Sequence, residues 1–278
     1  MDDCVHPRPH NGSRTEPMNR IAESTTFIVK AFMRPQCLDR LIDSCKKFYP
    51  DVRILVADDG DASVQRDDID MFRLPFDSGL SYGRNYLLDR IETEFFVLMD
   101  DDHVLTEKTM LERLLVALES GEFDLVGCEV HEDAAHFAWE GLFRRADDSL
   151  TLALGDRGEI NGIMRVDFCH NFFAARTEAV RRVRWDDHFK MGEHTDFFLR
   201  CQDQIRVGIC PSVQVCHAPE RHSGYNIYRD RAEQAFRADF LRKHGLRELI
   251  IELHPDRVSR GNPAKRLLAH LSRVVRRA

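Results

Sequence analysis

The stretch Phe95-Phe96-Val97-Leu98-Met99-Asp100-Asp101-Asp102 decides the fold. Five consecutive apolar residues with no polar alternation predict a strand that is buried on both faces, as in a parallel sheet. Three carboxylates follow it directly. Because carboxylates confined together repel one another, they need a cation or good solvation to offset their charge. Oxygen ligands of this kind suit Mg²⁺ or Mn²⁺, and the alternative is a solvated acidic turn that caps the following helix.

Strand and helix patterns alternate outward from this stretch. Short β-rich runs are expected at 25–29, 52–57, 71–74 and 125–130, and helical spacing at 36–48, 83–91 and 109–119. This alternation predicts right-handed βαβ units, and hence an α/β fold with a single Rossmann-like domain whose mostly parallel central sheet is flanked by helices. Ligands of such sheets bind beyond the carboxyl ends of the strands.

The second half of the sequence is less regular. We expect loops over 140–161, a last strand at 205–210 followed by 213–217, and helical segments over 228–244. No linker separates two domains. The loop at 218–226 is expected to be mobile.

Charge is distributed unevenly along the chain. The 278 residues carry a formal net charge of −7, which argues against nucleic acid as a partner because phosphate binding needs a basic surface. Residues 256–278 hold seven Lys or Arg against Asp256 alone, a charge of +6, so residues 1–255 carry −13. The sequence thus combines an acidic body with a basic C-terminal tail.

The eight cysteines include no C-x-x-C pair. A structural zinc site is therefore not expected, and we interpret the cysteines as free thiols of a reducing compartment. No apolar run approaches the roughly 20 residues of a membrane span. The stretch Met1 to Arg20 is polar and lacks the apolar segment of a signal peptide.

Two further polar clusters follow predicted strands. Asp58-Asp59 ends the second strand, where a carboxylate can accept hydrogen bonds from a ribose; the alternative is a turn, since Asp-Asp-Gly-Asp has strong turn chemistry. The stretch Gly79 to Asn85 joins a glycine turn to a helix start. Helix N-termini favour phosphate, and Arg84 can add a charge-assisted bond, although a plain turn and cap fits the pattern equally well.

Later in the sequence, the Glu193–Asp196 pair and His217 are further candidate site residues. Glu193 and Asp196 are three residues apart, and on a helix start they would share a face. One of them could act as a general base toward a hydroxyl, or either could cap the helix. His217 follows a strand, and a neutral imidazole there can complete a metal shell; a structural histidine is the alternative.

Read in order, these residues resemble a glycosyltransferase of the GT-A fold. The matching stretches are Thr25–Lys30 with Arg34, Val56–Asp59, Gly79–Asn85, Val97–Asp102 and Asn171–Thr177. The similarity extends from about Thr25 to Ala218. It is strongest to the β-1,4-N-acetylgalactosaminyltransferase family that includes ganglioside GM2/GD2 synthase, and it is compatible with the broader glycosyltransferase family 2.

The resemblance implies a nucleotide-sugar site. Asp100-Asp101-Asp102 matches the D-x-D motif, which holds Mn²⁺ or Mg²⁺ against the diphosphate of a UDP-sugar. Asp102 would be the most direct metal ligand, Asp100 a second ligand and a ribose or sugar contact, and Asp101 part of the same donor-binding motif. His217 would complete the metal shell.

The resemblance also implies donor contacts and a base. Lys30 and Arg34 would line the nucleotide pocket, Asp58-Asp59 would contact the uridine, and Arg84-Asn85 would lie near the diphosphate and donor sugar. The H-x-E-F-F pattern of the family reads His194-Thr195-Asp196-Phe197-Phe198 in this sequence. The base would therefore be Asp196, with Glu193 as the second candidate.

We therefore predict an inverting, metal-dependent glycosyltransferase that moves GalNAc or a related sugar from a UDP-sugar to a glycan or glycolipid. Its segments would be a disordered tail at 1–22, a GT-A domain at 23–255 and a basic amphipathic tail at 256–278. A nucleotidyltransferase is the first alternative, but it would need a glycine-rich loop after the first strand. A non-catalytic sugar-nucleotide or glycan-binding protein is the second.

The sequence departs from the eukaryotic members in its N-terminal stretch, which resembles no signal anchor. We expect a bacterial cytoplasmic enzyme that is peripheral at the inner face of the membrane. Apolar residues of the tail recur at helical spacing among basic ones, namely Leu267, Leu268, Leu271, Val274 and Val275. Such a helix can lie on an anionic membrane surface, or it can pack on the domain as a solvated helix.

Overall fold

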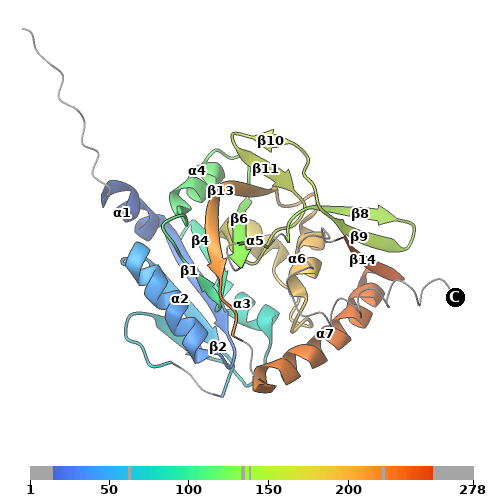
Figure 1. The fold of residues 1–278 in the computed structure, drawn as a ribbon, viewed down its shortest axis with the longest axis horizontal. Helices are drawn as coiled ribbons and strands as arrows, with labels where there is room; N and C mark the ends of the chain where they lie inside the picture. Colours follow the sequence, from blue (N-terminus) through green and yellow to red (C-terminus); the bar gives the residue numbers. More distant parts are fainter. Residues whose placement is uncertain (1–14, 62–63, 133–134, 138, 221–222, 253–278) are drawn as a thin grey trace, which may run out of the picture.

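The computed structural model describes residues 15–61, 64–132, 135–137, 139–220 and 223–252. Its first half alternates strands and helices as the apolar pattern predicts (Figure 1). The elements are β1 Thr25–Ala31, α2 Pro35–Phe48, β2 Arg53–Asp58, β3 Asp70–Arg73, α3 Leu80–Leu88, β4 Phe95–Asp100, β5 His103–Val104, α4 Leu111–Glu119 and β6 Leu125–Glu132. Strand β4 is the run identified above, and its five apolar residues are buried.

The second half contains more strands than the sequence indicated. Its elements are β7 Ala135–His136, β8 Leu142–Ala146, β9 Ser149–Ala153, β10 Glu159–Ile160, β11 Ile163–Val166, β12 Phe173–Arg176, α5 Thr177–Val183, α6 Glu193–Cys201, β13 Val207–His217, α7 Ser223–His244 and β14 Glu248–Glu252. The expectation of loops over 140–161 is wrong. Strands β8 and β9 form a hairpin that β14 extends in parallel, and this pairing partner lies almost 100 residues further along the chain.

Within the described residues, the large sheet has the order β10-β11-β13-β6-β12-β4-β1-β2-β3. Strands β4, β1, β2 and β3 are parallel, and β13 is parallel to β6. Strand β12 is antiparallel to both β4 and β6 and joins the two parallel groups. The sheet is therefore mixed, with the mostly parallel core that the βαβ pattern predicted.

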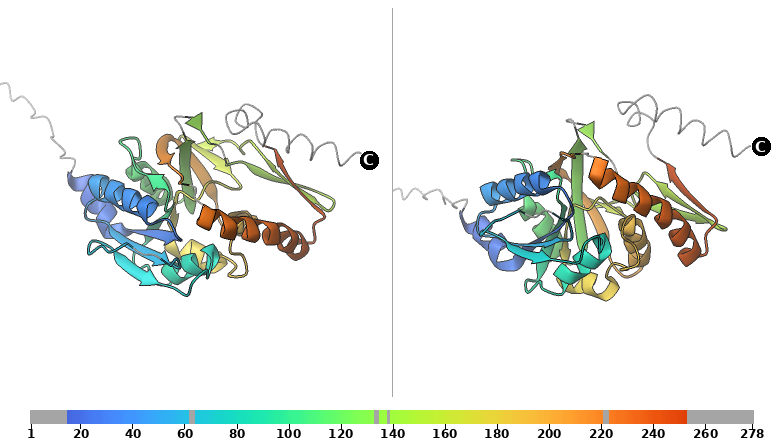
Figure 2. Two further views of the ribbon diagram at one scale, coloured as in Figure 1. Left: turned by 60° about the horizontal axis from the view of Figure 1, so that its bottom comes forward. Right: turned by 90° about the horizontal axis from the view of Figure 1, so that it is seen from below.

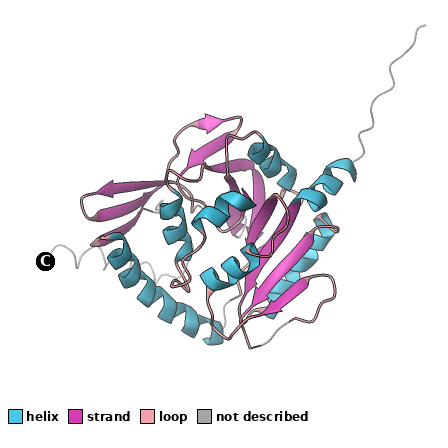
Figure 3. Ribbon diagram, turned by 180° about the vertical axis from the view of Figure 1, so that it is seen from behind, coloured by secondary structure: helices cyan, strands magenta, loops and turns pink. Residues whose placement is uncertain are grey.

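Helices cover both faces of the sheet (Figures 2 and 3). Residues of α2 and α4 pack with one set of sheet side chains, and those of α3, α5 and α6 pack with the other. Period-2 alternation along buried strands divides the apolar side chains between the two layers; Phe27 and Val29 face one, whereas Ile28 faces the other. The strands are thereby held rigidly, and their carboxyl ends share one edge.

Two segment boundaries differ from the prediction. Helix α1 spans Thr15–Ser24, so helix begins inside the segment expected to be a disordered tail. The reason is tertiary, because Ile21 is buried in the core and Arg20 pairs with Glu119 of α4 at 2.5 Å. Helix α7 begins at Ser223, inside the loop expected over 218–226. Residues 1–14 and the basic tail, with its expected amphipathic helix, lie outside the described residues.

The described part of the chain contains no helix with the length and apolarity needed to cross a bilayer. The seven cysteines that the structure describes are free thiols, as predicted. Burial raises the pKa of the Cys45, Cys128 and Cys169 thiols, which keeps them protonated and unreactive.

Candidate active site

Each of the three aspartates at the end of β4 pairs with one of two arginines. Arg34 pairs with Asp101 and, through Nη1, with Asp102 Oδ2 at 2.6 Å. Arg84 donates from Nη2 to Asp100 Oδ1 at 2.7 Å. The sheet register explains the approach of Arg34, because Lys30 of β1 lies beside Asp100 of β4 and the following loop passes Asp101 and Asp102. The carboxylate repulsion expected from the sequence is thus offset within the chain.

Burial and pairing shift the pKa values of two neighbouring aspartates in opposite directions. Burial raises the pKa of Asp101, and the Arg34 charge only partly opposes this effect. Burial also acts on Asp102, but a hydrogen bond with His217 and the charge of Arg34 outweigh it and lower the pKa of Asp102. Asp102 is therefore the carboxylate held ready as an anion, whereas Asp101 Oδ2 is buried with no hydrogen-bond partner.

His217 lies beside this anion, at the end of β13. Its Nε2 is 3.4 Å from Asp102 Oδ2, and its Nδ1 is 3.2 Å from Glu132 Oε2. Pairing of His217 with His103 across β13 and β5 brings the ring to the aspartates. Burial disfavours a charged imidazole, but the carboxylates of Asp102 and Glu132 outweigh it and raise the pKa of His217.

A carboxylate and an imidazole fit a shared Mn²⁺ or Mg²⁺ site, with the diphosphate supplying further oxygens. Asp102 and His217 would hold the cation. Across residues 15–252, apart from the short undescribed gaps, no group of three or more His, Cys, Asp or Glu side chains is arranged to hold a metal by itself. Arg34 Nη1 contacts the same Asp102 oxygen that faces His217, so this oxygen already attracts positive charge.

The residues that we expect to contact the nucleotide lie at the ends of β1 and β2. Lys30 pairs with Asp59, and both side chains are about 1% exposed. Asp59 Oδ2 also accepts a hydrogen bond from the Gly79 amide at 2.8 Å. Asp58 accepts from the Gly60 amide at 2.9 Å and pairs with Arg73. Asp58 thus makes the turn contact that the sequence offered as the alternative, whereas Asp59 is held by long-range contacts with Lys30 and the Gly79 amide.

The helix start after Gly79 is built for close packing. Gly79 has φ of +98°, a conformation that glycine adopts without steric cost, and precedes α3. A Cβ on Gly83 would overlap the Lys30 side chain, so this glycine permits Lys30 to pass behind α3. Arg84 is fully buried. Asn85 donates to the Trp185 carbonyl at 2.8 Å and to Asp187 Oδ1 at 2.7 Å, so its amide is engaged with the 185–187 segment.

The two candidate bases occupy different surroundings, contrary to our expectation of a shared face. Glu193 begins α6 and pairs with Arg84, which also binds Asp100. Glu193 is 1% exposed, and its Oε2 has no hydrogen-bond partner. A continuous polar chain therefore joins Glu193 to the aspartates.

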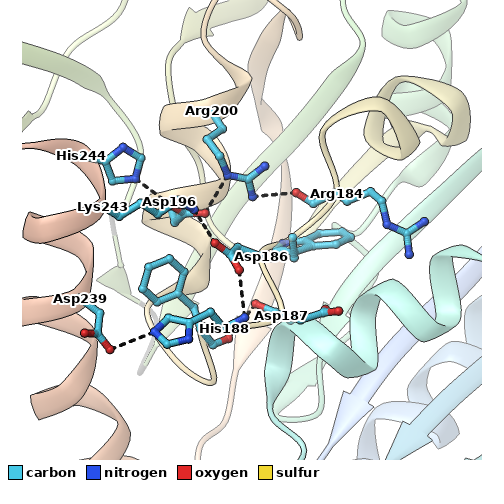
Figure 4. Close-up of polar contacts among 12 residues, drawn as sticks. Arg184, Asp186, Asp187, His188, Asp196, Arg200, Asp239, Lys243 and His244 are labelled. Atoms are coloured by element: carbon cyan, nitrogen blue, oxygen red, sulfur yellow. Dashed lines mark hydrogen bonds and ion pairs between the residues drawn. The ribbon is translucent and has the colours of Figure 1, made fainter.

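Asp196 instead lies in a cluster between α6 and α7 (Figure 4). Its Oδ1 accepts from Lys243 at 2.6 Å and contacts His244 Nε2 at 2.8 Å, and its Oδ2 accepts from Arg200 at 2.8 Å. Burial alone would raise the pKa of Asp196, but these hydrogen bonds lower it to about 2. Both oxygens are occupied, and the side chain is 0% exposed.

Three aromatic residues and one asparagine near the strand-end aspartates were not among the predicted site residues. Phe137 stacks on His217 with ring centroids 6.0 Å apart, and the Trp139 ring lies 5.5 Å from that of His194. Tyr225 of α7 covers the Arg34 guanidinium at 4.4 Å. Asn171 donates to Asp100 Oδ2 at 3.3 Å. Only Asn171 had a sequence signal, because it begins one of the stretches that carry the family resemblance.

The sheet topology and the charged strand-end site define a protein of the GT-A class. The chain belongs to glycosyl transferase family 2, whose sequence pattern matches residues 26–189. This result confirms both the fold class and the family resemblance predicted from the sequence.

Curated relatives point to a narrower group. The chain is 31% identical over 206 residues to the mouse β-1,4 N-acetylgalactosaminyltransferase 2 and 33% identical over 216 residues to the human β-1,4 N-acetylgalactosaminyltransferase 1. These matches cover 72% and 71% of this chain but only 40% and 39% of the relatives. The chain thus spans about two fifths of the length of these relatives.

Solved structures share the fold at low sequence identity. The Staphylococcus aureus TarS structure of residues 1–349 with UDP-GlcNAc aligns with a TM-score of 0.53 and 14% identity, covering 72% of this chain and 60% of TarS. GalNAc-T7 with UDP, GalNAc and Mn²⁺ aligns with a TM-score of 0.56 and 12% identity, covering 72% of this chain and 44% of that one. These likenesses establish a common GT-A architecture.

Proposed function

We propose that this chain is an inverting glycosyltransferase that depends on a divalent cation and transfers GalNAc, or a related hexose or hexosamine, from a UDP-sugar to a hydroxyl of a glycan or glycolipid. One observation carries the proposal. The ends of β4 and β13 and the start of α6 bring together the Asp102–His217 pair, the Arg84-linked Asp100 and a Glu193 with an unpartnered oxygen. Donor activation needs the first two groups, and acceptor deprotonation needs the third.

The relatives support the donor class. Two curated relatives are named as N-acetylgalactosaminyltransferases. Structures of the same fold are described with UDP, UDP-GlcNAc, GalNAc and Mn²⁺. We extend these donors and this cation to the present chain because its strand ends carry groups that suit them. The Asp102–His217 pair suits a divalent cation, and the nearby arginines suit a diphosphate.

The donor side of the mechanism follows from the charges. A divalent cation, when bound, supplies positive charge against the departing diphosphate. Asp102 and His217 would hold it. Arg34 lies within reach of the same oxygen, so its guanidinium is positioned to move from Asp102 to a phosphate oxygen as the donor binds. Lys30 and Asp59 shape the nucleotide end of the pocket.

On the acceptor side of the mechanism, we assign the base to Glu193 rather than to Asp196. A base must reach the acceptor hydroxyl and accept its proton. Glu193 Oε2 is unpartnered, and Glu193 Oε1 pairs with Arg84, which also binds Asp100. Asp196 instead has both carboxylate oxygens engaged by Arg200, Lys243 and His244 and a lowered pKa, which suits a structural role. Glu193 would deprotonate the hydroxyl that attacks the anomeric carbon from the face opposite UDP.

The alternatives fit the site less well. A nucleotidyltransferase binds a triphosphate with a glycine-rich loop after the first strand, whereas residues 31–34 read Ala-Phe-Met-Arg. A non-catalytic binding protein would need the nucleotide contacts but no base. A Glu193→Gln variant separates this second alternative from an enzyme.

The test is a UDP-release assay with UDP-GalNAc, UDP-GlcNAc, UDP-Gal and UDP-Glc, in Mn²⁺ and after EDTA. We expect release with one donor, its loss in EDTA, and a fall of at least a hundredfold in Glu193→Gln. Asp102→Asn should raise the Mn²⁺ concentration needed for half-maximal rate. EDTA-resistant release would refute the cation, and full turnover by Glu193→Gln would refute the base.

A further inference from the structure

Glu132, the last residue of β6, contacts the nitrogen of the His217 ring that does not face the aspartates. Its Oε2 is 3.2 Å from His217 Nδ1, whereas His217 Nε2 is 3.4 Å from Asp102 Oδ2. The two nitrogens belong to one rigid ring, so the two carboxylates bracket the imidazole. Glu132 therefore binds the side of His217 that the proposed cation site leaves unused.

Backbone pairing fixes the position of Glu132. Strands β6 and β13 run parallel and pair up to the residue before Glu132 and the residue before His217, so these two side chains are neighbours at the strand ends (Figure 1). On its other side, Glu132 pairs with Ala135 of β7. The Phe137 ring, which directly follows β7, lies against the His217 imidazole with an interplanar angle of 10°. The imidazole is thus held at Nδ1 by Glu132 and on one face by Phe137.

The chemistry of the two groups decides which ring nitrogen carries the proton. An ionised carboxylate only accepts hydrogen bonds, so His217 Nδ1 must be the donor to Glu132. A neutral imidazole has one donor and one acceptor nitrogen, so Nε2 then keeps its lone pair. A metal ligand needs this lone pair. Metal-binding histidines almost always donate their other ring N–H to a carboxylate, a backbone carbonyl or water.

We propose that Glu132 is a positioning residue that holds His217 in its Nδ1–H form, with Nε2 directed at the cation site beside Asp102. This inference rests on the proposed function and adds a residue that acts on the donor side of the reaction. Because Glu132 contacts Nδ1, its effect on the cation passes through the imidazole of His217.

The tautomer of His217 gives the first test, which needs no metal. Nitrogen–proton correlation spectra of the metal-free protein, labelled at histidine and recorded at a pH where the His217 ring is neutral, distinguish Nδ1–H from Nε2–H rings. The His217 signals are identified among the 13 histidines as those missing in His217→Ala. We expect the Nδ1–H form in the wild type and its loss in Glu132→Ala. A wild type with Nε2–H as its main form would overturn the proposal.

Cation binding gives a second test that does not depend on turnover. The electron paramagnetic resonance signal of free Mn²⁺ reports how much Mn²⁺ the protein binds in the presence of UDP. We expect Glu132→Ala to raise the Kd for Mn²⁺ about 10–100-fold, as is typical when the partner behind a metal-binding histidine is removed. Glu132→Gln should bind Mn²⁺ at least about fivefold more tightly than Glu132→Ala, because its amide oxygen also accepts the Nδ1 proton.

Glu129 supplies the matched control. It belongs to the same strand and is half-buried like Glu132, but its Oε2 contacts His131 Nε2 at 2.9 Å and accepts from Gln214 Nε2 at 3.3 Å. Glu129→Ala removes the same charge and should leave the Kd for Mn²⁺ within about twofold of the wild type.

A double variant tests whether Glu132 acts through His217. In the variant that combines Glu132→Ala with His217→Ala, the Kd for Mn²⁺ should equal that of His217→Ala alone within about twofold, because the ring that Glu132 positions is gone. Effects of the two substitutions that simply add would show that Glu132 acts on the cation by another route and would overturn the proposal.

The remaining outcomes separate this inference from the proposed function. A wild type that binds no Mn²⁺ in the presence of UDP would refute both. Tight Mn²⁺ binding by the wild type together with an unchanged Kd in Glu132→Ala would overturn the positioning role alone. A rise in Kd as large in Glu129→Ala as in Glu132→Ala, or no recovery of affinity in Glu132→Gln, would do the same.

Discussion

Replacing Asp196 by asparagine should destabilise the protein without removing its chemistry. The substitution keeps the shape of the side chain but removes the charge that Arg200, Lys243 and His244 share. Two of these partners belong to α7, and Arg200 also donates to the carbonyls of Val183 and Arg184 at 2.8 Å. Asp196 therefore ties α7 and the segment after α5 to α6 (Figure 4).

The magnitude follows from burial and from the pKa. Removing one partner of a buried ion pair costs about 3–5 kcal/mol. The partner side chains here are 13–30% exposed and keep some water, which lowers the estimate. The pKa of Asp196 lies at about 2, against an ordinary value of 3.8, a difference that corresponds to about 2.4 kcal/mol. We therefore expect a loss of about 2–3 kcal/mol, or roughly 5–10 °C in Tm.

The pH dependence has a definite sign. Because folding lowers the pKa of Asp196, its contribution to stability is fully present above pH 3.8 and is lost as the pH falls toward 2. The difference in stability between the wild type and Asp196→Asn should therefore be constant from about pH 5 to 7 and shrink below pH 4. This window distinguishes the loss of a charge from a general packing defect.

Urea unfolding followed by circular dichroism measures the effect, and the UDP-release assay run well below the Tm measures the chemistry. Asp239→Asn is the control, because Asp239 pairs with His188 and Arg242, whose side chains are 63% and 74% exposed. Its cost should be below about 1 kcal/mol. Unchanged urea stability of Asp196→Asn together with a hundredfold loss of turnover would refute this reasoning and restore Asp196 as the base.

Two substitutions on the donor side should also be informative. Arg84→Met should cost about 3–5 kcal/mol in urea unfolding, because it leaves Glu193 buried without its cationic partner; unfolding at the wild-type midpoint would contradict this. Gly83→Ala should cost about 1–3 kcal/mol and raise the Kd for UDP, because the new Cβ displaces Lys30 from Asp59. Calorimetric titration with UDP checks the second effect, and an unchanged Kd would show that Lys30 does not shape the nucleotide pocket.

Much of the site could be predicted because its residues adjoin the strands that carry them. The apolar run at 95–99 predicts β4, and the aspartates follow it by covalent connection. The same holds for Asp58-Asp59 after β2 and His217 at the end of β13. Parallel neighbours then bring these ends to one edge, so the α/β pattern was sufficient to group them.

The sequence could not show which acidic residue of the site has which role. Glu193 and Asp196 look equivalent at a spacing of three residues. The partners that distinguish them are Arg84, 109 residues from Glu193, and Lys243 and His244, 47 and 48 residues from Asp196. The hairpin β8–β9 was missed because its partner β14 and the core packing of Phe143, Leu150 and Leu152 supply its stability.

The sequence by itself determined the α/β class, the family and the acidic strand end, since these depend on periodicity and on covalent neighbours. Only the tertiary structure decided that Glu193 pairs with Arg84 whereas Asp196 pairs with α7, how Arg34 and Arg84 pair with the aspartates, and where Trp139 lies. Those features arise from long-range contacts, whose energies depend on which buried charges and rings meet when α6, α7 and the sheet pack together.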